Sequence, residues 1–477
     1  MSLIYSDGTD VCCSKFYIEL HYESILSLLH VSESNVLGRR KANAIHSSIL
    51  NTFEKLGRLS NKNVVLFLFL FTFTISAPML IGFEMGDDVS REENKDIKIF
   101  RDRAQTILDG ELLYRDTEMI TVSPPVINYL FLPVLILGDT LLLWCSWFAF
   151  FLFLTSVVLF FFLEPWFDRR LAIAGSMIYS SSPFGQFTSI AMLQDDAIIV
   201  TFLALSMLFL SRKRWYLAAA SLGLGTVTKL FPALCSPFAV LGPDKWESRM
   251  YAASIGLGIA FLISLPFLMY ASSDYTQFLE FYLSGIQPDS DTQTSYRVSL
   301  TEQRGMSFWR FMGETIYFVP SAVLHLVMLV SLIVTWVAVH QRKLEIPAAF
   351  SLSILSIFVF YSKIHYGYHL MALLVLIPWA LHDAKRIWGL FGMSFLAAMV
   401  HLAWRDRFFT DNSWVHLAFA FTLWLYWIYW AKIIIQNPDF TQRNKVRSQE
   451  SILIACGWIV ILCMAYSLQV GIVSALG

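Results

Sequence analysis

Long apolar segments recur along most of the chain, and they constrain its fold more than any other feature. A straight transmembrane helix needs about 20 residues, and the hydropathy rule finds about thirteen candidates. These candidates lie at residues 63–83, 140–163, 171–188, 196–211, 215–229, 231–243, 250–272, 318–340, 346–362, 366–382, 387–404, 413–434 and 452–475. The mean hydropathy of +0.57 agrees with this pattern. We therefore predict an all-α polytopic membrane protein with about 11–13 transmembrane helices, because the short pair 215–229 and 231–243 leaves the count open by two.

The basic residues predict an orientation, because loops rich in Lys and Arg stay on the cytoplasmic side. Residues 1–62 are polar and end in a basic stretch, so we expect a cytosolic tail before a membrane domain at 63–477. Residues 84–139 and 273–317 are then external loops. The membrane is the cell membrane, or that of the endoplasmic reticulum in a eukaryote. The predicted cytoplasmic loops carry Arg169 and Arg170; Arg212, Lys213 and Arg214; Lys245 and Arg249; Arg342 and Lys343; Lys385 and Arg386; and Arg443, Lys445 and Arg447.

Charge and cysteine content exclude several classes of protein. The net charge of −1 provides no basic field for nucleic acid. The six cysteines show no metal-ligand spacing, so we predict neither a zinc site nor a disulfide framework. We expect no cofactor, and dependence on a metal ion stays open.

The first external loop contains an amphipathic segment. Ile97, Phe100 and Ala104 recur at helical spacing, charged residues occupy the opposite side, and Gly110 follows. This pattern predicts a helix that can lie in the membrane interface. Asp96 stands at its N-terminus, either as a helix cap or as a functional carboxylate.

The run at 124–137 follows the sequence SPP and is apolar but short. We predict that it dips into the membrane and returns instead of crossing it. Irregular backbone at membrane depth is tolerated only where protein or a water-filled cavity covers it. The amphipathic helix and this re-entrant segment together form the predicted first external loop.

Further polar residues fall on the same predicted face. Asp195 and Asp196 begin a span and are either a wet helix end or part of a site. Lys229 lies among apolar residues, where an ammonium group is costly, so it is either functional or extends to the interface. His365 and His369 have the i,i+4 spacing of one helix face, but no carboxylate follows in a metalloprotease pattern. We predict no metal site there.

The order of these features resembles a known family. The blocks DIKIFRDRAQTILDGELLY, SPPVINYLFLP, LQDDAIIVTFLALSMLFLSRKRWYLAAASLGLGTVTKLFPAL and SKIHYGYHLMALLVLIPW span roughly residues 63–382. They resemble polyprenol-phosphate-sugar-dependent glycosyltransferases of the C superfamily, with the closest pattern in glycosyltransferase family 87. Mycobacterial mannosyltransferases belong to that family, and the first mannosyltransferase of the GPI-anchor pathway is similar.

The resemblance implies a C-superfamily helical bundle that transfers a hexose from a polyprenyl (dolichyl) phosphate to a glycan or glycolipid. Because known members of the family are mannosyltransferases, mannose is the expected hexose. Asp96 is the implied catalytic base of an inverting reaction. The GPI-pathway enzyme has two aspartates where this chain has Asn94 and Asp96, so a two-carboxylate metal site is not expected. The expected donor-phosphate residues are Lys229, His365, His369, Arg101 and Arg103, and the expected substrate-binding residues are Tyr114, Pro124, Pro125, Gln194, Asp195 and Asp196.

A secondary transporter or a lipid-linked sugar translocase is the alternative. Transporters typically have repeated halves and a site near the bilayer midplane. The loop at 84–139 has no counterpart later in the chain, and the polar residues lie at one predicted face. A structural scaffold would leave Lys229 and the SPP segment unexplained. The enzyme is therefore the preferred interpretation, with the sugar and the acceptor left open.

Overall fold

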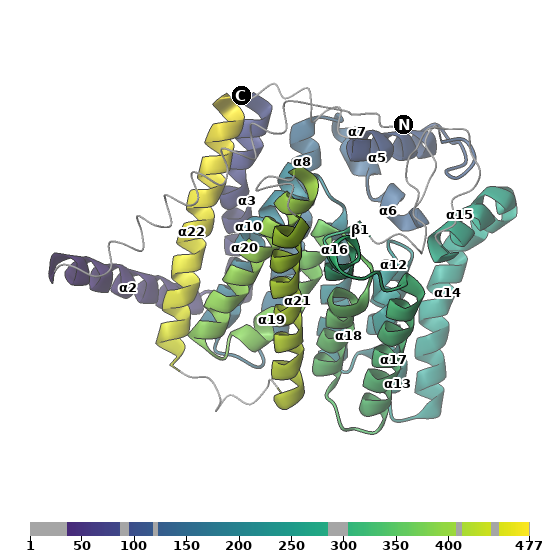
Figure 1. Cartoon of the computed structure of the whole chain (residues 1–477). Coiled ribbons are helices and arrows are strands. Elements are labelled where there is room, and N and C mark those ends of the chain that lie inside the picture. Colours follow the sequence, from purple (N-terminus) through teal and green to yellow (C-terminus); the bar gives the residue numbers. More distant parts are fainter. Residues whose placement is uncertain are drawn as a thin grey trace.

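The protein is a bundle of helices (Figure 1) in a computed structural model that describes residues 36–85, 95–117, 123–284, 304–406, 413–439 and 448–476. Parts of several predicted segments lie outside the described residues. These parts are residues 1–35 of the tail, 86–94 and 118–122 of the first external loop, 285–303 of the second, 407–412, and the basic residues Arg443, Lys445 and Arg447.

Six of the described helices are long and apolar enough to cross a membrane by length and composition. Two of them, α14 and α17, are mostly exposed, so their apolar side chains are available to lipid. α22 packs along α3, where Gly82 and Gly471 let the two backbones touch, as small residues do between membrane helices. The six helices are α3 (Asn61–Met85), α8 (Leu141–Leu163), α14 (Trp246–Tyr270), α17 (Ser321–His340), α21 (Ser413–Gln436) and α22 (Gln449–Leu476).

The remaining predicted spans are also helical. Every residue of α19 is buried, so protein and not lipid surrounds this helix. Helices inside the bundle can be short or broken because neighbouring helices satisfy their polar groups. These elements are α9 (Arg169–Ser181), α10 (Pro183–Gln186), π-helix η1 (Phe187–Ala191), α11 (Asp196–Ser211), α12 (Trp215–Thr226), 3₁₀-helix η2 (Phe231–Cys235), α13 (Ser236–Leu241), α18 (Ile346–Phe360), α19 (His369–Ala380) and α20 (Ala384–Asp406). The prediction of an all-α polytopic membrane protein is confirmed, whereas the number of crossings stays a prediction.

The predicted amphipathic helix is α5 (Lys95–Leu108), which lies across the upper end of the bundle in Figure 1. Ile97, Phe100 and Ala104 are buried, and Gly110 follows the helix with φ of 77°, a conformation that suits glycine. The SPP segment forms two short helices that contact α5, α6 (Pro125–Tyr129) and α7 (Leu132–Leu137). Neither is long enough to cross a bilayer.

Five further elements complete this end of the bundle. α15 (Ser272–Ser284) continues from α14, and α16 (Phe308–Thr315) packs against α21. β1 (Arg304–Gly305) pairs in parallel with β2 (Lys363–Ile364), and 3₁₀-helix η3 (Tyr366–Tyr368) follows. This two-residue ladder is a small exception to the predicted all-helical structure. It joins the second external loop to the segment that precedes α19.

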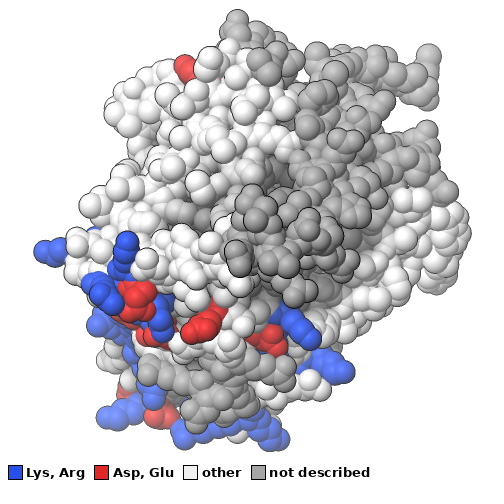
Figure 2. Space-filling view, turned by 90° about the vertical axis from the view of Figure 1, so that its left-hand side faces the viewer, with Lys and Arg blue, Asp and Glu red and all other residues white. Residues whose placement is uncertain are grey.

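A separate group of charged side chains lies near α2 (Val36–Gly57) and the start of α9. Glu54 of α2 pairs with Arg170, which also contacts Asp168 at the start of α9, and Arg169 pairs with Glu164. Figure 2 shows charged side chains in the lower part of the face formed by α2 and α22, below a described surface that is almost free of charge. Such a distribution suits a membrane protein whose basic end is cytoplasmic.

Candidate active site

Asp96 lies in the first turn of α5 and is bound by a residue far away in the sequence. Its Oδ2 accepts a hydrogen bond from Gln194 Nε2 at 2.6 Å, and the same nitrogen donates to Met192 O at 3.0 Å. Gln194 is buried and Asp96 is half-buried. π-helix η1 and the positive φ of Leu193 (52°) bend the chain just before Gln194. A bulge of this kind often marks a functional segment.

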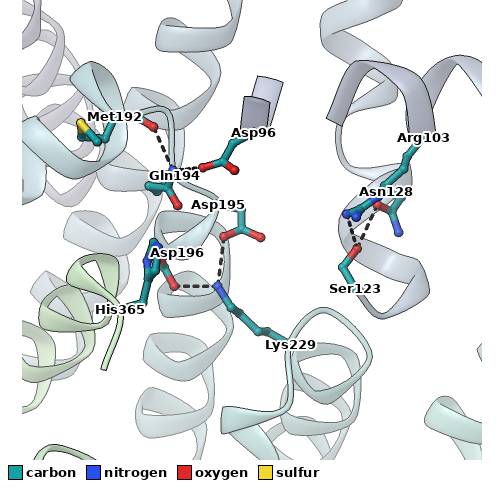
Figure 3. A network of polar contacts seen from close by, with 10 residues as sticks. All are labelled: Asp96, Arg103, Ser123, Asn128, Met192, Gln194, Asp195, Asp196, Lys229 and His365. Carbon is teal, nitrogen blue, oxygen red and sulfur yellow. Dashed lines mark hydrogen bonds and ion pairs between the residues drawn. The ribbon is translucent and has the colours of Figure 1, made fainter. Parts of the chain in front are cut away.

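A partly buried ion-pair cluster lies below Asp96 in Figure 3. Lys229 Nζ is 3.1 Å from Asp195 Oδ1 and 2.9 Å from Asp196 Oδ1, and His365 Nδ1 is 3.8 Å from Asp196 Oδ2. Lys229 also lies over the ring of Tyr368, 5.5 Å from its centroid. Only 2% of Asp196 is exposed. Asp196 is therefore shielded from solvent, and the ammonium group of Lys229 pairs with both carboxylates.

The predicted helical pairing of His365 and His369 is wrong. His365 follows β2, η3 intervenes, and His369 is the first residue of α19, so the two side chains do not share an α-helical face. His369 instead packs among aromatic rings, with centroid distances of 5.0 Å to Phe184, 5.4 Å to Phe358 and 5.6 Å to Trp427. Only His365 is brought to the ion-pair cluster.

Gly367 is where the turn between β2 and α19 lies against Asp196. A Cβ atom at this position would overlap the Asp196 carboxylate. The absence of a side chain therefore lets the turn between β2 and α19 lie directly on Asp196. His365, two residues before this glycine, and Tyr368, directly after it, contact the cluster from the same turn.

Arg103 forms the second polar group of the site. Its Nη1 donates to Ser123 Oγ at 2.8 Å, and Ser123 Oγ donates to Asn128 Oδ1 at 3.2 Å. Tyr114 Oη donates to Ser123 O at 2.9 Å, and Asn128 Nδ2 donates to Pro124 O at 3.1 Å. Arg103 is only 3% exposed. Burial lowers the pKa of its guanidinium to about 10, although nearby negative charges act in the opposite direction.

The remaining predicted residues hold this end of the bundle together. Pro124 and Pro125 are buried and begin α6, and Val126 N donates to Val227 O at 3.0 Å, which joins α6 to the Lys229 segment. Arg101 pairs with Asp139 at 2.5 Å, just before α8. The structure therefore places Arg101 in a contact between α5 and α8, apart from the cluster around Lys229.

Sequence reasoning missed Ser123, Asn128, Gly367 and Tyr368. Asn128 had a signal, because it is a polar residue within an otherwise apolar run at membrane depth. Gly367 had none, since its importance depends on a contact with a residue 171 positions earlier. Within the described residues, no group of three or more His, Cys, Asp or Glu side chains could hold a metal ion.

The fold and the site together define a polytopic membrane protein whose polar residues converge at one end of a helical bundle. Residues 122–362, half of the chain, match the sequence model of glycosyltransferase family 87. The protein belongs to this family and is a membrane glycosyltransferase. Membership of this family favours the glycosyltransferase interpretation over the transporter interpretation. Asp96, Arg103 and Tyr114 precede the matched region, so the match does not cover them.

The solved structures that are similar at a distance include the oligosaccharyltransferase of Archaeoglobus fulgidus in its apo form. The sequences are 14% identical, and the TM-score is 0.40. The similarity covers 82% of this chain and 57% of the other, so this protein spans little more than half of that enzyme's length. A likeness this distant carries no argument about function. No curated protein matches the sequence.

Proposed function

We propose that the protein transfers a hexose from a polyprenyl phosphate carrier to a glycan or glycolipid at the external face of the membrane. The reaction inverts the anomeric carbon, and Asp96 is the base. The observation that carries this proposal is the 2.6 Å hydrogen bond from Gln194 to Asp96 in a member of glycosyltransferase family 87. It holds a carboxylate of the first external helix beside the buried polar residues of the site.

The chemistry requires one proton acceptor and one cation. Asp96 takes the proton from the acceptor hydroxyl while that oxygen attacks the anomeric carbon. The bond between this carbon and the phosphate oxygen breaks, and the polyprenyl phosphate leaves with the electron pair. A cation at the phosphate stabilises the charge that develops there. The described site offers two such cations, the buried Arg103 and the half-buried Lys229.

Asp96 suits the role of base better than its neighbours. Asp195 and Asp196 both pair with Lys229, so an ammonium group already engages their carboxylate oxygens. Asp96 accepts a hydrogen bond from the amide of Gln194, which orients its carboxylate.

A lipid-linked donor fits the position of the site. α5 is amphipathic and lies across one end of the bundle, where an interfacial helix meets lipid headgroups. A polyprenyl chain can stay in the bilayer there while its phosphate and sugar reach Asp96. The family resemblance makes mannose on a dolichyl-type carrier the proposed donor. With the site on the external face, the N-terminal tail is cytoplasmic.

Loss of the gene tests the proposal and identifies the acceptor. We expect mass analysis of a deletion strain to show a glycan or glycolipid that lacks one hexose, with the polyprenyl-phosphate hexose accumulating. The anomeric configuration of the missing residue should be opposite to that in the donor. Unchanged glycans and glycolipids, together with unchanged carrier lipids, would contradict the proposed function.

A further inference from the structure

α2 leaves the bundle at one boundary of the membrane. It is followed at Asn61 by α3, which is long and apolar enough to cross a bilayer. α8, a second such helix, ends at the same place, because Arg169 pairs with Glu164, the residue after α8, and donates to Leu59 O at 2.8 Å. Figure 1 shows α2 running outward from this junction, crosswise to α22. Its first half therefore extends beside the bundle at the level where two membrane helices reach the boundary.

The second half of α2 is held against the bundle, whereas residues near its start are exposed. Ile49 is buried against α22, and Glu54 pairs with Arg170 of α9 at 2.9 Å. Toward the N-terminus, residues 43–45 are exposed, and the exposed fraction of Ile45 is 38%. An apolar side chain that is exposed on a helix at a membrane boundary can be covered by acyl chains.

The apolar face of α2 continues beyond the part that contacts the bundle. At about 100° per residue, Ala42 and Ile45 lie within about 40° of Ile49 around the helix. Positions 39 and 41, which are both basic, lie about 80° to either side of Ile49. A helix whose apolar face is bordered by Lys and Arg typically lies in the membrane interface, with its charges among the headgroups. The first half of α2 has this pattern.

The charge of this region selects the kind of lipid. Residues 36–62 include six basic residues and one acidic residue, Glu54, which is itself paired with Arg58 and Arg170. A basic cluster of this size beside a membrane span is typical of segments that bind anionic headgroups, and each Lys or Arg near the surface strengthens such binding about fivefold. Figure 2 shows Lys and Arg side chains in the lower part of the surface formed by α2 and α22. The six basic residues are Arg39, Arg40, Lys41, Lys55, Arg58 and Lys62.

We propose that the first half of α2 lies in the membrane interface and binds anionic lipid headgroups. Ile45 then contacts acyl chains, and the basic residues at positions 39–41 lie among the headgroups of the leaflet in which α3 begins. This interaction is independent of the proposed sugar transfer, since α5 and Asp96 lie at the upper end of the bundle in Figure 1, away from α2.

A fluorophore at position 45 tests this contact in the full chain. The protein carries Cys12→Ser, Cys13→Ser and Ile45→Cys, is labelled with NBD, and is placed in phosphatidylcholine nanodiscs with increasing phosphatidylserine content. Nitroxide groups on the acyl chains quench a fluorophore that touches them. We expect quenching that rises with the phosphatidylserine content. A label on Ser47→Cys, about 160° away from position 45 around the helix, should stay unquenched.

The basic residues at the start of α2 are tested by the triple variant Arg39→Gln, Arg40→Gln, Lys41→Gln. It should lower the equilibrium constant for the contact at position 45 by at least about tenfold. The melting temperature should not change, because this part of α2 extends beside the bundle. The matched control removes three exposed lysines from other loops that are predicted to be cytoplasmic, and it should be quenched as strongly as the protein without these substitutions. Its substitutions are Lys245→Gln, Lys343→Gln and Lys385→Gln.

Three results, each with the protein folded, would overturn the proposal. They are the absence of quenching at position 45, quenching that does not depend on phosphatidylserine, and equal quenching in the triple variant and its control. Absence of quenching together with a disulfide between two unlabelled Ile45→Cys chains would assign the exposed face of α2 to a second copy of the protein instead.

Discussion

Asp96 can be distinguished from a simple helix cap because the two roles respond differently to one substitution. Asn accepts the Gln194 hydrogen bond and caps a helix nearly as well as Asp, but it cannot take a proton. We expect Asp96→Asn to keep the wild-type melting temperature and to lose at least about a hundredfold in transfer rate, the low end of a general base's contribution. A radiolabelled transfer assay measures this rate.

Asp109→Asn is the matched control for that experiment, because Asp109 is an exposed carboxylate one residue beyond the same helix. It should transfer sugar at the wild-type rate. If Asp96→Asn also does so, Asp96 is a structural residue, and the base lies elsewhere in the site.

Lys229 contributes to stability as well as to the site. Lys229→Met leaves the buried Asp196 and its neighbour Asp195 without their cation, and breaking a buried ion pair costs about 3 kcal/mol. We expect a lower free energy of unfolding, measured by denaturation in detergent, together with loss of transfer. Adding Asp196→Asn should recover part of the stability and none of the transfer. Wild-type stability in Lys229→Met would show that these contacts do not hold the site together.

Among the elements, the turn between β2 and α19 is the part of the site most sensitive to one added atom. Gly367→Ala puts a methyl group into the Asp196 carboxylate, so the turn must move away from the cluster. We expect transfer to fall by at least about tenfold and the melting temperature to drop, as over-packing costs about 1–3 kcal/mol. Parallel transfer assays and melting curves measure both effects.

Gly258→Ala serves as the comparison, since a Cβ atom there meets nothing within 4 Å. Ala is also the better helix former, so this variant of α14 should be at least as stable as the wild type. Equal transfer rates for Gly367→Ala and Gly258→Ala would show that the turn between β2 and α19 does not contribute to the site.

Local patterns predicted single elements better than contacts between them. The spacing of Ile97, Phe100 and Ala104 predicts α5, because it depends on neighbouring residues. The i,i+4 spacing of His365 and His369 was misleading, since β2 and η3 precede α19 and His365 lies outside that helix. The position of Arg103 was accessible from the sequence, because i,i+7 places it on the face of Asp96.

At the scale of the whole molecule, the apolar segments predict the helical membrane fold, and the positions of the polar residues predict which end carries the site. The pairing of Lys229 with Asp195 and Asp196 could not be predicted, because it joins residues 33 and 34 positions apart across two helices. Central helices such as α19 are shielded by protein, so hydropathy alone does not decide how many helices cross the membrane.

Orientation is tested by labelling single cysteines in intact cells. The described cysteines are buried, so a background with Cys12→Ser and Cys13→Ser should label little. In that background we expect Ser273→Cys, in α15, to react with a membrane-impermeant maleimide from the external side. Lys245→Cys, at the start of α14, should react only after permeabilisation. The reverse pattern would place the site on the cytoplasmic face and contradict the external reaction.

The central claim is that the donor is a sugar on a polyprenyl phosphate. Its most direct test is the initial rate of hexose transfer by the purified protein in nanodiscs, with polyprenyl-phosphate mannose, glucose and galactose compared with the corresponding nucleotide sugars. We expect transfer from a polyprenyl-phosphate hexose and none from a nucleotide sugar, with Asp96→Asn reducing the rate at least about a hundredfold. Transfer from a nucleotide sugar alone, at a rate that Asp96→Asn does not change, would contradict the account.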